Sequence, residues 1–101
     1  MIFKVPKSFC LHGQKIEVKF DPLLICKDDN EGEAHYRINE IILMPSTEGT
    51  PRLPSQIEES FCHELVHFLF HFAQYPHLRA DEDLVNRVAG LLHQALTTME
   101  N

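Results

Sequence analysis

Cysteine is scarce in this chain, which has three cysteines in 101 residues, Cys10, Cys26 and Cys62. An odd number of cysteines at wide spacings argues against a disulfide framework and against a metal site built from thiolates. Cys62 falls on the apolar side of a predicted helix, where a packed thiol is favoured over a ligand. We therefore expect reduced cysteines that bind no metal.

Basic residues and long apolar runs are also lacking. Nine Lys and Arg stand against 15 Asp and Glu, a formal net charge of −6, and the basic residues are scattered, so we expect no binding to nucleic acid. No apolar run approaches a membrane span, and residues 1–6 lack the basic region and apolar stretch of a secretory signal. We expect a cytoplasmic protein with no membrane contact.

The residues that are present have an ordinary globular composition, 44% hydrophobic and 24% charged. A chain of this size buries about 65% of its unfolded surface, enough for one modest core. No repeat or low-complexity segment divides it. We therefore expect a single domain over residues 1–101.

The N-terminal half has the alternating pattern of β-strands. Alternation over residues 1 to about 20 predicts a hairpin that turns at His12-Gly13-Gln14. Two further strands are predicted at Ala34–Ile38 and Ile41–Met44, with a tight turn at Asn39-Glu40.

The C-terminal half has helical periodicity. A loop of turn-forming residues, Pro45–Pro51, precedes a first helix whose start is predicted from a capping box of Ser55 and Glu58 and whose end is predicted near residues 74–76. A second helix is predicted from about Asp81 to about Met99, with one wide apolar face. Together the elements predict an α+β fold, in which a small, mostly antiparallel sheet of three to five strands packs against two helices on one face.

The first helix carries His63-Glu64-Leu65-Val66-His67, which spells H-E-x-x-H. Residues four apart lie on the same face of a helix, so His63 and His67 can present two imidazoles to one cation. Glu64 points about 100° round from His63, where a carboxylate can take a proton from water beside the metal.

The alternative is a helix whose histidines are simply solvated, and the neighbouring residues favour a metal site instead. Apolar residues gather on one side of the helix, whereas His63 and His67 lie on the opposite side with other polar residues, so we expect the histidines to face away from the core. The apolar side comprises Ile57, Phe61, Cys62, Leu65, Phe68, Leu69 and Phe72.

A third ligand is needed, because catalytic zinc usually has three protein ligands and an open position. Asp81, Glu82 and Asp83 open the second helix. Asp81 lies nearest the centre of the apolar face, while Glu82 lies at its flank, from where a longer side chain can reach a metal on the neighbouring helix. We favour Glu82; Asp81 or His77 remains possible, and the acidic cluster could also serve only the helix dipole.

The other polar residues receive weaker assignments. His71 cannot join the same ion, because three imidazoles would span about 12 Å of straight helix, so we place it beside the ligands or on the substrate side. His12, His35 and His93 are interpreted as surface residues. The unranked candidates to stabilise an oxyanion are Tyr36, Tyr75, His71, His77 and Arg79.

The motif of residues 63–67, followed by the segment Glu82–Leu92, resembles the two active-site helices of small gluzincins, especially the ImmA/IrrE-like and phage-type metallopeptidases. In these a Glu opens a helix of the form E-x-x-A-N-x-F-A-x-x-L-L, and here Val85 and Val88 replace the Ala and Phe. The resemblance covers roughly residues 33 to 96. It implies a zincin-like fold, with one zinc ion held by His63, His67 and Glu82 and with Glu64 as general base.

These expectations describe a zinc-dependent peptidase that acts on a peptide or protein, with strand Ile41–Met44 as the candidate edge that pairs with an extended substrate. The sequence indicates no oligomeric state. Two alternatives stay open: a zinc-stabilised regulatory or protein-binding domain without turnover, and a domain without metal.

Overall fold

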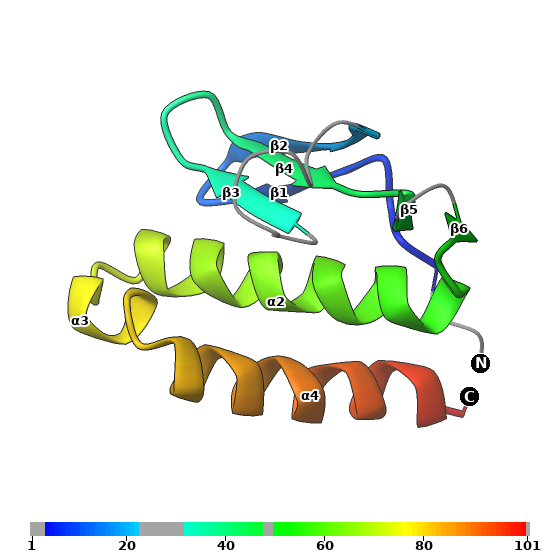
Figure 1. Cartoon of the computed structure of the whole chain (residues 1–101). Helices are drawn as coiled ribbons and strands as arrows, with labels where there is room; N and C mark the ends of the chain where they lie inside the picture. The colour runs from blue at the N-terminus through cyan, green and yellow to red at the C-terminus, as the bar shows by residue number, and fades with distance from the viewer. Residues whose placement is uncertain (1–3, 23–31, 48–49, 101) are drawn as a thin grey trace.

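The computed structural model describes residues 4–22, 32–47 and 50–100 of the chain. Cys26 lies outside these ranges. The fold is α+β, as predicted (Figure 1). Its elements are β1 (Ser8–Leu11), β2 (Gln14–Phe20), β3 (Gly32–His35), β4 (Glu40–Leu43), β5 (Ser46–Thr47), β6 (Thr50–Pro51), α2 (Pro54–Phe72), α3 (Pro76–Arg79) and α4 (Glu82–Thr98).

The elements form three layers, with α2 between the sheet and α4 (Figure 1). Both long helices lie on the same side of the sheet, as predicted, but α2 packs on the sheet whereas α4 packs mainly against α2. The one-turn helix α3, which lies where we predicted only a connection, helps to turn the chain back so that α4 runs antiparallel to α2. No helix among the described residues is long and apolar enough to cross a bilayer.

The main sheet has the order β1-β2-β4-β3, and it is mostly antiparallel as predicted, with β2 and β4 the parallel pair. The predicted first hairpin is confirmed, and its turn places Gly13 at a φ of 72°, which glycine adopts without strain. Ile16, Ile41 and Leu43 are fully buried, and their strands therefore contribute the core face of the sheet.

The second predicted hairpin differs in its boundaries. β3 ends at His35, and residues 36–39 form the turn, so the predicted strand Ala34–Ile38 is too long. The predicted turn at Asn39-Glu40 is also wrong, because Glu40 already pairs with His35. Asn39 instead ends the turn at a φ of 52°, a left-handed conformation that asparagine tolerates.

The other boundary differences are local. A short ladder pairs Ser46 with Pro51 inside the predicted loop. The helix α2 begins at Pro54, and the Gln56 side chain accepts a hydrogen bond of 2.9 Å from the Leu53 main-chain nitrogen. The predicted capping box of Ser55 and Glu58 is therefore wrong, since proline suits the first helical position and moves the start of the helix earlier.

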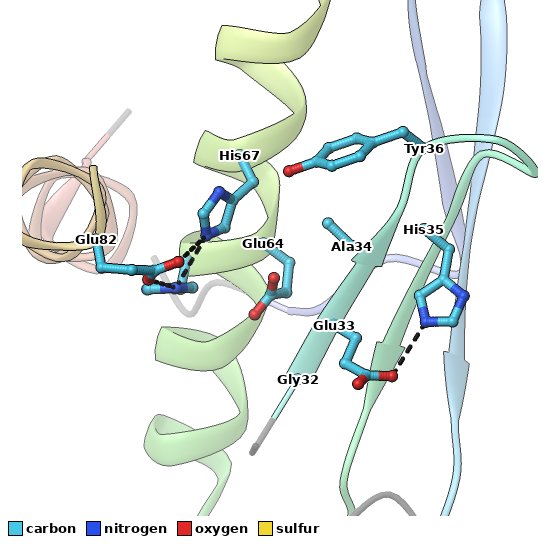
Figure 2. A pocket seen from close by; sticks show the side chains of 9 residues that line it. Gly32, Glu33, Ala34, His35, Tyr36, Glu64, His67 and Glu82 are labelled. Atoms are coloured by element: carbon cyan, nitrogen blue, oxygen red, sulfur yellow. Dashed lines mark hydrogen bonds and ion pairs between the residues drawn. The ribbon is translucent and has the colours of Figure 1, made fainter. Parts of the chain in front are cut away.

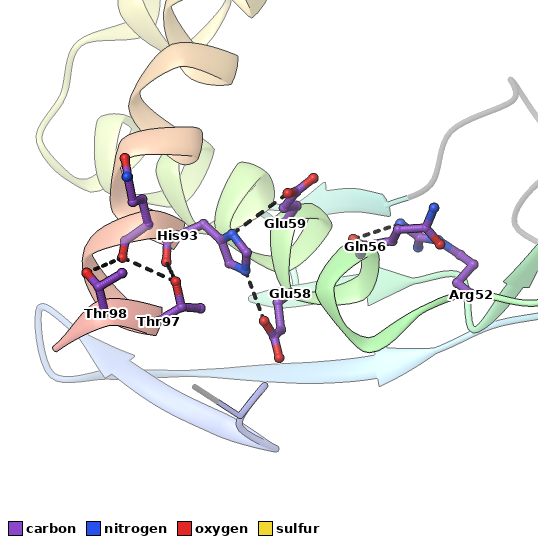
Figure 3. A network of polar contacts seen from close by, with 8 residues as sticks. Arg52, Gln56, Glu58, Glu59, His93, Thr97 and Thr98 are labelled. Carbon is purple, nitrogen blue, oxygen red and sulfur yellow. Dashed lines mark hydrogen bonds and ion pairs between the residues drawn. The ribbon is translucent and has the colours of Figure 1, made fainter. Parts of the chain in front are cut away.

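The polar side of α2 lies against α4. His67 is only 8% exposed, so the prediction that the histidines face away from the core is wrong. Further along the interface, His93 Nε2 of α4 lies 2.9 Å from the Glu58 carboxylate (Figure 3), and His93 is therefore not a surface residue as predicted. The apolar face of α4 is narrower than predicted, because Val85 is fully buried but Leu91 is 69% exposed.

We expect Glu58→Ala to lower the free energy of unfolding by about 1–3 kcal/mol, because the half-buried His93 N–H would lose its acceptor. Urea unfolding of the zinc-free protein would measure this. The matched control is Glu59→Ala, since the Glu59 carboxylate is 65% exposed and 3.8 Å from His93, a contact that contributes little. Equal effects of the two substitutions would contradict a specific role for Glu58.

Candidate metal centre

Three side chains from α2 and the first turn of α4 converge on one point. The two oxygens of Glu82 lie 3.0 Å from His63 Nε2 and 3.2 Å from His67 Nε2, and these two nitrogens are 3.2 Å apart (Figure 2). One ligand atom from each residue lies within 4.8 Å of the others, a group that could hold one cation. The structure thus brings together the predicted histidine pair, His63 and His67, and the favoured acidic residue, Glu82.

The local folding of α4 explains why Glu82, of the three acidic residues, is the one that contacts the two histidines. The carboxylate of Asp81 accepts a hydrogen bond of 3.1 Å from the Leu84 main-chain nitrogen, so it caps the helix and places Glu82 in the first turn. The alternative ligand Asp81 is thus engaged elsewhere, and His77 is exposed on α3 outside the converging group. Although the Glu82 side chain is 65% exposed, it reaches both histidines from the flank of α4.

The donor set fits a zinc ion. Two imidazole nitrogens and a carboxylate are zinc's usual oxygen and nitrogen ligands, and they leave room for water or substrate. Burial lowers the pKa of His67, while Glu82 raises it and His63 lowers it, so the ring tends toward the neutral form that binds metal. The buried His67 Nδ1 has no hydrogen bond of normal geometry within the described residues, although the main chain of Arg79 is near enough to raise the same pKa.

Glu64 lies beside this group, 6% exposed, on the side of α2 that faces the sheet. Its carboxylate enters the space between α2 and β3 (Figure 2). Burial, together with the nearby charges of Glu82 and Glu33, raises the pKa of Glu64 to about 8. A cation at the centre would oppose this shift, since it favours the ionised carboxylate.

Gly32 at the start of β3 makes room for Glu64. A Cβ atom added at Gly32 would lie 3.1 Å from Glu64 Oε2 and 3.2 Å from a methyl group of Leu43, tighter than ordinary contacts. The absence of a side chain therefore allows α2 and β3 to approach closely with a carboxylate between them. The sequence pattern alone gives no sign of this contact.

An open cleft of about 380 Å³ connects His63, His67 and Glu82 to β3. The predicted substrate edge, Ile41–Met44, is wrong, because β4 lies between β2 and β3 inside the sheet. Among the described strands, β3 is the edge strand beside the cleft. Its residues Glu33 and His35 line the cleft, and His35 Nε2 lies 3.1 Å from Glu33 Oε1. His35, interpreted as a surface residue, thus belongs to the cleft, and only the strand order reveals this.

The remaining predicted site residues are divided between the cleft and the surface. Tyr36 lines the cleft, and His71 and Arg79 contact Tyr36 behind it. Tyr75 is 58% exposed and does not line the cleft. Cys62 is fully buried as predicted, and burial raises the pKa of its thiol to about 11, which suits a packed residue.

Comparisons of the chain with known protein families, with curated proteins and with solved structures find no match. What the chain does must therefore be inferred from the chemistry of the site itself.

Proposed function

We propose that this protein is a zinc-dependent peptidase. One observation carries the proposal: His63, His67 and Glu82 converge within 4.8 Å, next to the buried carboxylate of Glu64 in an open cleft. Each of these side chains has the type and position that metal-assisted hydrolysis requires. The resemblance of the two helices to those of small gluzincins agrees with this arrangement.

Three residues would hold the ion and a fourth would move protons. His63, His67 and Glu82 would hold zinc, which supplies a Lewis acid that makes water a nucleophile near neutral pH. Glu64 takes a proton from the water whose oxygen adds to the peptide carbonyl carbon. Glu64 then gives that proton to the amine nitrogen as the C–N bond breaks.

The substrate would be an extended peptide that lies along β3. An edge strand leaves main-chain groups unpaired on one side, and an added strand can hydrogen-bond to them. β3 borders the cleft through Gly32, Glu33 and His35, so a peptide in this position would pass beside Glu64.

A second function has one observation in its favour. The ligands come from both α2 and α4, so an ion bound by His63, His67 and Glu82 would also fasten the two helices together. A zinc-stabilised regulatory or protein-binding domain would need no more than this. The two functions differ in whether the zinc-loaded protein cleaves peptides.

We expect the purified protein to bind about one equivalent of zinc per chain and to cleave unstructured peptides when loaded. Zinc at about 1,000 times its dissociation constant should add roughly 4 kcal/mol to the free energy of unfolding. Elemental analysis, thermal unfolding with and without chelator, and a peptide library read by mass spectrometry would measure these quantities. Failure to take up added zinc would contradict both functions, whereas uptake without cleavage would favour the regulatory one.

A further inference from the structure

Tyr36 presents a hydroxyl group to the cleft that the proposed chemistry has not yet used. The residue lies in the turn after β3 and lines the cleft together with Glu64, His67 and Glu82. Figure 2 shows its hydroxyl end directed toward α2 beside His67, on the side of the cleft that Glu64 enters. Among the five candidates for oxyanion stabilisation, Tyr36 is thus the one that lines the cleft.

The ring of Tyr36 is held by side chains from two helices. Phe68 of α2 meets it edge to face at a centroid distance of 5.2 Å, and His71 of α2 stacks on it at 4.6 Å and 23°. The guanidinium carbon of Arg79, from α3, lies 4.7 Å from the ring centroid. A donor fixed in this way needs little reorganisation when charge develops in front of it.

Arg79 and His71 are also bonded to each other. Arg79 Nη1 donates a hydrogen bond of 2.9 Å to His71 Nδ1, and because a guanidinium only donates, the His71 nitrogen is the acceptor. The pair therefore has one defined arrangement against the Tyr36 ring. The short helix α3 thus places Arg79 where it can fix a residue on the β3–β4 turn.

The hydroxyl of Tyr36 keeps its proton at neutral pH. Burial raises the pKa of Tyr36, Arg79 opposes this, and the charges of Glu64 and Glu82 add to it, so that the pKa of Tyr36 is about 12. A protonated hydroxyl can donate a hydrogen bond to an anionic oxygen.

We propose that Tyr36 is a catalytic residue whose hydroxyl donates a hydrogen bond to the oxyanion of the substrate, and that Arg79 and His71 are positioning residues that hold its ring. The assignment rests on the proposed peptidase function. As the water oxygen bonds to the carbonyl carbon, the π-electron pair moves to the carbonyl oxygen and the water proton goes to Glu64. Tyr36 donates to that oxygen without losing its proton, and the pair returns when the amine leaves with the proton from Glu64.

Tyr36→Phe tests the assignment, because it removes the hydroxyl and keeps the ring. We expect kcat to fall about 10²- to 10³-fold, with KM nearly unchanged. A second readout is binding to the zinc-loaded protein: affinity for a phosphinic peptide, which mimics the tetrahedral oxyanion, should fall about 100-fold. Affinity for the matching uncleaved peptide should be the same with and without Tyr36→Phe. Both proteins in this comparison carry Glu64→Gln, so that the peptide is not cleaved. The matched control is Tyr75→Phe, which alters a tyrosine outside the cleft and should change neither quantity.

The positioning role of Arg79 needs a test that separates it from a merely structural one. Arg79→Ala should lower kcat about tenfold, and Arg79→Lys, which keeps a cation and a donor, should restore most of it. In the Tyr36→Phe background, Arg79→Ala should have almost no further effect on kcat, because both substitutions remove the same interaction.

Three outcomes would overturn the assignment. An unchanged kcat in Tyr36→Phe would remove its catalytic role and leave the peptidase intact. Equal losses of affinity for the phosphinic and uncleaved peptides would mean that Tyr36 contributes to peptide binding in general and does not stabilise the oxyanion. A wild-type protein that binds zinc, cleaves no peptide and does not prefer the phosphinic peptide would overturn the peptidase function, and the role of Tyr36 with it.

Discussion

Glu64→Gln is expected to abolish nearly all peptide hydrolysis while zinc content and fold are retained. A general base is commonly worth about 10² to 10⁴ in rate, and glutamine preserves the shape of the side chain but cannot accept the proton. The position suits such a test, because Glu64 is 6% exposed and packs closely against Gly32, so the substitution should keep the size of the side chain, as glutamine does. Binding of an uncleaved peptide should survive the change.

The measurement compares initial rates, zinc stoichiometry and circular dichroism of wild type and Glu64→Gln. Glu59→Gln is the matched control, since it removes a carboxylate from the same helix at an exposed position. It should retain wild-type activity. If Glu64→Gln hydrolyses peptides as fast as wild type, another residue accepts the proton. If wild type itself is inactive while both proteins bind zinc and the same partner, the regulatory function should replace the peptidase.

The candidate metal ligands could be proposed from the sequence because their positions depend on local geometry. Four-residue spacing on a helix places His63 next to His67 in any fold, and an acidic residue at the start of the next helix returns to them if the two helices are antiparallel neighbours. Periodicity alone did not choose between Glu82 and Asp81, and the longer side chain at the flank of the apolar face favoured Glu82. The cap could not be predicted: in the structure the Asp81 carboxylate accepts a hydrogen bond from the Leu84 nitrogen.

The surroundings of the ligands could not be predicted, because they depend on contacts between distant segments. The helical wheel of α2 shows one apolar side, and nothing in it indicates that the polar side packs against α4, as the buried His67 demonstrates. The strand order β1-β2-β4-β3 of the described strands likewise makes β3 an edge strand, although the alternating sequence pattern is the same in edge and central strands. The roles of Gly32 and His35 in the cleft follow only from that order.

Glu82→Ala is expected to weaken zinc binding more than any other substitution in the acidic cluster at the start of α4. Loss of one of three ligands should reduce affinity by well over the roughly 10- to 100-fold that accompanies loss of an outer partner of a metal site. The physical reason is the contact of Glu82 with both His63 Nε2 and His67 Nε2, at 3.0 and 3.2 Å. Because Glu82 is 65% exposed, the metal-free protein should fold nearly as well as wild type.

The matched controls lie on either side of Glu82 in the sequence. Asp81→Ala removes the helix cap and should cost about 0.5–2 kcal/mol of stability with zinc affinity within roughly tenfold of wild type. Asp83→Ala should change neither stability nor zinc affinity, because the Asp83 carboxylate is 86% exposed and its ion pair with Arg87, at 3.7 Å, joins two exposed side chains. Competition with a chromogenic chelator gives the three affinities. If Asp81→Ala weakens zinc binding the most, the third ligand is Asp81. The position at the centre of the apolar face would then have predicted the ligand better than the flank position of Glu82.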